Sequence, residues 1–152
     1  MKILLIDNEN EIRSILKDMV IACGNGLYII EEANGVLSGV EKINSFQPNI
    51  VLLDVEMNDG TGFDLLKQFP KPTFQLIFTT AHNQYAIQAF KFSAIDYLLK
   101  PIDPIELNNS LQRAKENISS QTMEQQLAIL MQQFTNKTDS EKQIVIKDID
   151  KT

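Results

Sequence analysis

Short apolar runs alternate along this chain with segments of helical period, and this alternation limits the folds that the chain can adopt. The runs Ile3–Ile6, Ile50–Leu53 and Leu76–Phe78 have the length of strands and carry apolar residues on both faces. Between the first two runs, apolar residues recur at helical spacing before Gly24 and Gly26: Ile12, Ile15, Leu16, Met19, Val20 and Cys23. Strands that are apolar on both faces and alternate with helices favour a parallel sheet that is covered on both sides.

The rest of the pattern completes five strands and five helices. Residues 27–33 and 95–99 are the other two expected strands, and the two glutamates in the first of these suggest a place near a sheet edge. Further helices are expected over residues 36–43, 63–69 and 85–92, and from Pro104 onward. Right-handed crossovers would connect these elements into an α/β, doubly wound, five-stranded parallel sheet.

Four polar residues follow expected strands at their carboxyl ends: Asp7, Asp54, Thr80 and Lys100. Because ligands of an open doubly wound sheet bind outside these ends, we expect the four side chains to share one edge. Asp7 and Asp54 would form a negative pocket that needs a cation, and oxygen donors open to solvent suit Mg²⁺. Lys100 and Thr80 offer a positive charge and a donor for phosphoryl oxygens, and Asp54 is the best placed nucleophile.

Each of these residues also has a purely structural interpretation. An Asp after a strand often forms a turn, and Asn8 or Asn10 can cap the first helix. Thr80 can cap a helix, and Lys100, which precedes Pro101, can be a solvated loop residue. The arrival of all four at one sheet edge favours the functional interpretation.

Composition excludes several other classes of protein. The 152 residues carry a formal net charge of -6, which argues against direct nucleic-acid binding by these residues. Cys23 is the only cysteine, so a disulfide framework within one chain is excluded, and we expect it to be a buried structural thiol. No signal-peptide pattern opens the sequence, and no apolar run approaches the roughly 20 residues of a spanning helix. We therefore expect a cytoplasmic protein without a membrane segment.

Four segments, ILLIDNE, IVLLDVEM, IFTTA and DYLLKPI, resemble the marker segments of the receiver domain of two-component response regulators. The resemblance covers about residues 1–118, and TTAHNQYAIQAFKFSAIDYLLKPI is similar to receivers of the LytTR (AlgR/AgrA-like) family of transcription factors. It implies a flavodoxin-like, CheY-like receiver fold with strand order 2-1-3-4-5 and a C-terminal helical extension.

The resemblance also implies a chemistry. A sensor histidine kinase would donate a phosphoryl group to Asp54, with Mg²⁺ held by Asp7, Asp54 and the backbone carbonyl of Glu56. Asn8 departs from the family pattern, which usually has an acid there. An amide oxygen can still coordinate Mg²⁺, so we expect weaker metal affinity rather than loss of phosphorylation. Asn58 stands where many receivers have proline, so the loop after Asp54 is expected to be less constrained.

The same resemblance assigns the remaining site residues. Lys100 would pair with the phosphoryl group, Thr80 would turn its hydroxyl toward it, and Tyr97 would swing inward, altering the face made by helix four, strand five and helix five. Glu56 and His82 would tune the lifetime of the acyl phosphate. The protein would thus be a signalling switch that controls an output such as transcription, with at most slow self-dephosphorylation, and not a metabolic enzyme.

The last third of the chain is expected to form a linker. Leu107, Leu111, Ala114 and Ile118 make one helical stripe, and Met123, Leu127, Leu130 and Phe134 make a second that is out of phase with it. Ser119–Ser120 therefore marks either a bend or a linker helix whose apolar face turns elsewhere. We expect a receiver over 1–118, a helical linker over 119–142, and the start of a truncated output domain over 143–152, which the resemblance implies to be of the LytTR DNA-binding type. The linker would either tether this domain or support a homodimer, which could also form through the helix 4–strand 5–helix 5 face.

Two other functions compete with the phosphoacceptor switch. The DGT in VLLDVEMNDGTG suggests a haloacid dehalogenase-like phosphatase, but Asp59 lies five residues after Asp54, whereas that motif places its second Asp two residues after the nucleophile. Asn8 suggests a degenerate receiver that binds a partner without phosphorylation.

Overall fold

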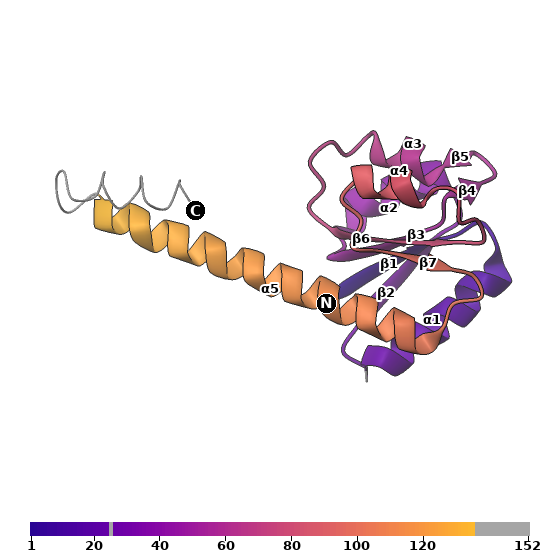
Figure 1. The fold of residues 1–152 in the computed structure, drawn as a ribbon, viewed down its shortest axis with the longest axis horizontal. Helices are drawn as coiled ribbons and strands as arrows, with labels where there is room; N and C mark the ends of the chain where they lie inside the picture. Colours follow the sequence, from indigo (N-terminus) through magenta and orange to yellow (C-terminus); the bar gives the residue numbers. More distant parts are fainter. Residues whose placement is uncertain (25, 136–152) are drawn as a thin grey trace. The chain divides into compact units, whose positions relative to one another are not determined.

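A five-stranded parallel sheet with helices on both faces forms the core of the computed structural model, which describes residues 1–24 and 26–135 (Figure 1). The strand order is β2-β1-β3-β6-β7, which is 2-1-3-4-5 when these five strands are counted along the chain. The strands are β1 (Lys2–Ile6), β2 (Ile29–Ala33), β3 (Ile50–Leu53), β6 (Gln75–Thr80) and β7 (Asp96–Leu99). The predicted doubly wound α/β fold is confirmed.

The helices divide between the two faces of this sheet. Figure 1 shows α1 and the first turns of α5 on one face, and α2, α3 and α4 on the other. Their bounds are α1 (Asn10–Gly24), α2 (Val36–Phe46), α3 (Gly62–Leu66), α4 (Ala86–Lys91) and α5 (Pro104–Thr135). Both faces of the central strands are therefore covered, and every residue of Ile3–Ile6 and Ile50–Leu53 is buried. Ile29, on the edge strand β2, is exposed, in line with the edge position expected for that strand.

Several element boundaries differ from the expected ones. β2 begins at Ile29 because Leu27 belongs to the turn after α1, where its N–H donates to the carbonyl of Gly24. α3 ends at Leu66 and does not reach Phe69, since Phe69 precedes Pro70 and a residue in that position disfavours helical backbone.

The expected apolar face of α1 is also narrower than predicted. Leu16 and Val20 are buried, but Ile15 is 57% exposed. Cys23 is partly exposed, so the prediction of a buried thiol is wrong, although burial still raises the pKa of that thiol.

A small hairpin after β3 was not predicted. β4 (Glu56–Met57) pairs antiparallel with β5 (Gly60–Thr61). In the turn between them, the Asp59 carboxylate accepts the N–H groups of Val36 and Leu37, at 2.7 and 3.0 Å, and so caps α2. These bonds lower the pKa of Asp59 and tie the hairpin to the neighbouring helix.

The chain divides into two compact units, 1–115 and 116–152. In the first unit α5 buries Leu107, Leu111 and Ala114, as its predicted stripe requires. α5 is helical through Ser119–Ser120, which is consistent with the expected linker helix. In the second unit the side chains of the other stripe are exposed: Met123, Leu127 and Leu130. Residues 136–152, including the expected output-domain strand, lie outside the described residues.

Candidate functional site

Two buried aspartates stand side by side at the carboxyl edge of the sheet. β1 and β3 pair in parallel with Ile6 opposite Leu53, so the next residues, Asp7 and Asp54, leave the sheet together. The residues are 0% and 5% exposed, respectively. The N–H of Asp54 donates to the carbonyl of Ile6 at 3.0 Å, which fixes its backbone against the end of β1.

Lys100 brings a cation between these carboxylates. Its Nζ lies 2.7 Å from Oδ2 of Asp7 and 3.1 Å from Oδ2 of Asp54. Its backbone N–H donates to the carbonyl of Thr80 at 2.8 Å, which carries the lysine from the end of β7 toward the neighbouring strand. Three charged groups, predicted from three separate strand ends, therefore form one cluster.

The charges in this cluster perturb one another. Burial raises the pKa of Asp54; the charge of Lys100 opposes this shift and that of Asp7 adds to it, so the pKa lies above its ordinary value. Burial acts to lower the pKa of Lys100, but its hydrogen bond to Asp7 and the charges of both aspartates outweigh burial, so this pKa lies above its ordinary value. Lys100 therefore stays charged, while burial in this site disfavours the charged form of Asp54.

Every polar atom of Asp7 has a partner. Its N–H donates to the carbonyl of Ala33 at 3.1 Å, and its Oδ1 accepts the N–H of Glu9 at 2.8 Å. Its Oδ2 accepts Lys100, and its carbonyl accepts the guanidinium of Arg13 at 2.5 Å. The loop after β1 is consequently fixed by bonds to β2, α1 and the end of β7.

Thr80, His82 and Tyr97 form the opposite side of the site. Thr80 ends β6 fully buried, and its Oγ1 accepts the N–H of His82 at 3.3 Å. The hydroxyl of Tyr97, on β7, donates to the carbonyl of His82. Glu56 contacts His82 Nε2 at 2.9 Å through Oε2, and its Oε1 accepts the hydroxyl of Tyr85 at 2.7 Å. The two proposed switch residues thus meet at the backbone of one residue.

A cavity of about 280 Å³ opens over Asp54 and Lys100 and is bordered by Asn8, Glu56 and His82. Among the described residues no three His, Cys, Asp or Glu side chains are grouped to hold a metal ion. The candidate donors are instead the Asp54 carboxylate and the Asn8 side-chain amide, which border the cavity, and the buried Asp7 carboxylate, which is joined to Asp54 through Lys100. This set fits Mg²⁺, which is commonly bound through one or two carboxylates and keeps several waters.

Asn8 lies at the mouth of this cavity beside Asn58. The Asn8 Nδ2 donates to the Oδ1 of Asn58 at 3.4 Å, a long bond between two partly or fully exposed side chains. Neither amide is therefore held in place as Asp7 is.

Sequence reasoning missed two residues that shape the site. Arg13 was not singled out because one Arg in a helical pattern carries no signal that it reaches a strand end. Gly62 begins α3 directly against the phosphoacceptor candidate, since a Cβ placed there would lie 2.6 Å from the carbonyl oxygen of Asp54. Its position in DGTG indicated only a turn, although such close backbone contact is a common reason for glycine.

The phosphatase alternative finds no support in this geometry. It would need Asp59 as a second acid beside Asp54, but both Asp59 oxygens accept backbone N–H groups at the start of α2.

No helix in the described part of the chain has the length and apolar character needed to cross a membrane.

Comparisons with known proteins agree with the fold. The family model described as the response regulator receiver domain matches residues 3–112. An uncharacterized response regulatory protein of Vibrio parahaemolyticus is 38% identical over 128 residues, covering 84% of this chain and 52% of that protein. The sensory transduction protein LytT of Bacillus cereus is 36% identical over 124 residues, covering 80% of this chain and 50% of that protein.

Solved structures give the same result. A response regulator receiver domain protein from Clostridium thermocellum superposes with a TM-score of 0.70 at 26% identity, covering 78% of this chain and 96% of that one. The chain spans about half the length of the curated relatives it matches. The receiver-type fold, the clustered strand-end residues and the match over residues 3–112 lead to one conclusion: this chain belongs to the response regulator receiver family.

Proposed function

We propose that this chain is a phosphoacceptor switch in which Asp54 receives a phosphoryl group from a sensor histidine kinase in a Mg²⁺-dependent reaction. The observation that carries the proposal is the Lys100 ammonium between two buried carboxylates, at 2.7 and 3.1 Å. A structural ion pair needs one carboxylate, whereas this cluster has a surplus negative charge beside an open cavity. A divalent cation and a phosphoryl group would complete its charge balance.

The proposed metal ligands are the side chains of Asp7, Asn8 and Asp54 and the backbone carbonyl of Glu56. When bound, Mg²⁺ would neutralise phosphoryl oxygens and help to orient the donor for in-line transfer. Asp7 is held in place by bonds to all its polar atoms, and its Oδ2 would become available to the metal if Lys100 moved away from it. Asn8 contributes an oxygen without a formal charge, and we infer a weaker affinity for the metal.

Residues of the chain itself would then bind the phosphoryl group on Asp54 and change conformation in response to it. Asp54 supplies the nucleophilic oxygen, and Lys100 can move from the two carboxylates to a phosphoryl oxygen within the same cluster. Thr80, now bonded only through its accepting oxygen to His82, has a hydroxyl proton to donate. If Thr80 turns toward the phosphoryl group, the His82 backbone loses one partner, and Tyr97, which donates to the same residue, can change its position.

We also propose how the lifetime of the acyl phosphate is tuned and what output the switch controls. Glu56 and His82 border the cavity, so both can limit the access of water to the acyl phosphate, and we propose at most slow self-dephosphorylation. The output, by the resemblance to receivers of the LytTR family, would be control of transcription. A homodimer could form through α4, β7 and α5, since Ile87 and Phe90 on α4 are 78% and 77% exposed, or through the linker helix.

The proposal is tested with acetyl phosphate. The full chain is incubated with Mg²⁺ and the donor, and the modified residue is found by intact mass and peptide mapping. We expect one adduct at Asp54 that disappears in Asp54→Asn and when EDTA replaces Mg²⁺. Absence of an adduct in the parent chain would favour the degenerate receiver, and rapid turnover of phosphomonoesters would favour the phosphatase.

A further inference from the structure

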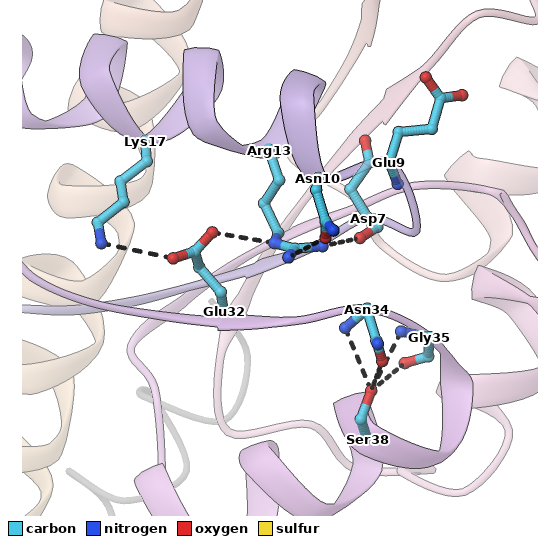
Figure 2. Close-up of polar contacts among 9 residues, drawn as sticks. All are labelled: Asp7, Glu9, Asn10, Arg13, Lys17, Glu32, Asn34, Gly35 and Ser38. Carbon is cyan, nitrogen blue, oxygen red and sulfur yellow. Dashed lines mark hydrogen bonds and ion pairs between the residues drawn. The ribbon is translucent and has the colours of Figure 1, made fainter.

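Arg13 joins three different segments near the candidate metal site. Figure 2 shows its guanidinium between the start of α1, the end of β1 and β2. It donates to the carbonyl of Asp7 at 2.5 Å, to Oδ1 of Asn10 at 2.6 Å, and to Oε1 of Glu32 at 2.9 Å. Its side chain is only 14% exposed.

The bond to Asp7 fixes the peptide group between two proposed metal ligands. The carbonyl that accepts Arg13 belongs to the peptide between Asp7 and Asn8, the two ligands supplied by this loop. Fixing this peptide sets the direction in which the Asn8 side chain leaves the backbone. Asn8 depends on this orientation because, within residues 1–24 and 26–135, its side chain makes only a long hydrogen bond, 3.4 Å, to Asn58.

We propose that Arg13, anchored by Glu32, is a positioning residue for the Mg²⁺ site: it holds the Asp7–Asn8 peptide in the orientation that lets both side chains bind the metal. This inference rests on the proposed function. Arg13 touches neither metal nor phosphoryl group, and it acts only through the loop. Partners that orient metal ligands in this way commonly change metal affinity by about 10- to 100-fold when they are removed.

The geometry requires arginine rather than a positive charge in general. A guanidinium spreads its donors over three nitrogens in one rigid plane and can bond to three separate acceptors at once, whereas an ammonium has all its donors on a single nitrogen. The charge itself opposes metal binding, because a cation near the site repels Mg²⁺. Positioning and electrostatics therefore predict opposite signs for removal of Arg13, and this makes the role testable.

Lys17 provides a matched control on the same helix. Its Nζ lies 3.4 Å from Oε2 of Glu32, so it shares the acidic partner of Arg13 (Figure 2). Unlike Arg13, Lys17 does not bond to the Asp7 carbonyl, and its side chain is 41% exposed. Lys17→Gln removes a charge and a Glu32 contact from α1 but leaves the bond to the metal loop.

The test is a Mn²⁺ titration of the full chain, in which electron paramagnetic resonance measures free Mn²⁺ and Mg²⁺ competition gives its affinity. We expect Arg13→Lys and Arg13→Gln to raise the half-saturating concentration about tenfold and Lys17→Gln to change it less than twofold. Glu32→Gln, which keeps Arg13 but removes its anchor, should raise it about threefold. At saturating Mg²⁺, acetyl phosphate should still modify Asp54 in each variant to an extent similar to the parent.

Thermal melting without metal distinguishes a positioning role of Arg13 from a purely structural one. A lower melting temperature for Arg13→Lys with an unchanged half-saturating concentration would show a structural clamp between α1 and β2 and overturn the inference. Tighter binding in Arg13→Gln would show that electrostatic repulsion dominates, which also overturns it. In both cases a phosphorylated parent chain leaves the proposed function intact. A parent chain that binds no Mn²⁺ and takes no phosphoryl group overturns both proposals.

Discussion

The two sides of the Asp54 site hold their polar groups in different ways. On the β1 side, the side chains of Asp7 and Lys100 are 1% and 11% exposed, and each polar atom of Asp7 has a partner. On the β6 side, the side chains of His82 and Glu56 are 41% and 48% exposed, and they contact each other at the protein surface. The charges of the first side are buried and have fixed partners, whereas on the second side the Glu56–His82 contact lies at the surface, although Thr80 is buried there.

This difference suggests a division of labour. Breaking a buried charge pair costs several kcal/mol, whereas an exposed pair contributes only about 0 to 1 kcal/mol. The buried side can therefore keep a charged ligand in one place, while contacts on the exposed side can exchange at little cost. A new charge at Asp54 can shift a conformational equilibrium only through groups whose contacts differ between the two states. We infer that the exposed side is where such a shift begins.

Among the variants proposed to test this difference, Lys100→Met is expected to have the largest effect on stability. The variant leaves Asp7 and Asp54 buried and without their cation, and we expect the free energy of unfolding at pH 7 to fall by about 3–5 kcal/mol. Urea denaturation measures this loss, and added Mg²⁺ should restore part of it. The matched control is Lys17→Met, which removes an exposed lysine and should cost less than about 1 kcal/mol. Equal losses in the two variants would mean that the burial of Lys100 has no energetic consequence.

A smaller effect is expected from Asn8→Asp. The added carboxylate restores one formal negative charge at the mouth of the site, so we expect about tenfold tighter Mg²⁺ binding. Asn58→Asp is the control, because it adds the same charge to an exposed neighbour of Asn8 and should have less effect. Equal Mg²⁺ affinity in wild type and Asn8→Asp would contradict the idea that Asn8 weakens the site.

The sequence predicted the buried side of the site better than the exposed side, for a physical reason. Asp7, Asp54 and Lys100 follow continuous apolar strands, and parallel pairing brings such strand ends together whatever the loops do. The structure brings these three side chains into one cluster. Topology could be argued from apolar periodicity for the same reason.

Elements without periodicity could not be predicted. β4 and β5 have two residues each, too few to show alternation. Their turn is set by Asp59, whose bonds to Val36 and Leu37 span more than 20 residues of sequence. The contact of Arg13 with the Asp7 carbonyl likewise depends on where α1 packs, and no local pattern encodes that distance.

Asp54→Asn tests the buried side through its pH dependence. Burial and the charge of Asp7 place the pKa of Asp54 above its ordinary value of 3.8 despite Lys100. The folded chain therefore binds this proton more tightly than the unfolded chain. The resulting stabilisation is fully present below pH 3.8 and is lost as pH rises through the raised pKa.

Asp54→Asn cannot lose this stabilisation, because an amide has no such proton. Its stability relative to wild type should therefore increase as pH rises from 3.8 through the raised pKa of Asp54. Parallel urea denaturation curves at several pH values measure the difference. A gap that does not change with pH would mean that Asp54 is not perturbed in the folded state.

The smallest effect is expected on the exposed side, from Glu56→Gln. The amide oxygen can still accept the Tyr85 hydroxyl, but the negative charge beside His82 is removed. Because both side chains are largely in water, we expect the free energy of unfolding to change by less than about 0.5 kcal/mol. Urea denaturation beside Lys100→Met gives the comparison directly. If Glu56→Gln destabilised the chain as much as Lys100→Met, the two sides would be equally rigid, and the exposed contacts could not be where the switch begins.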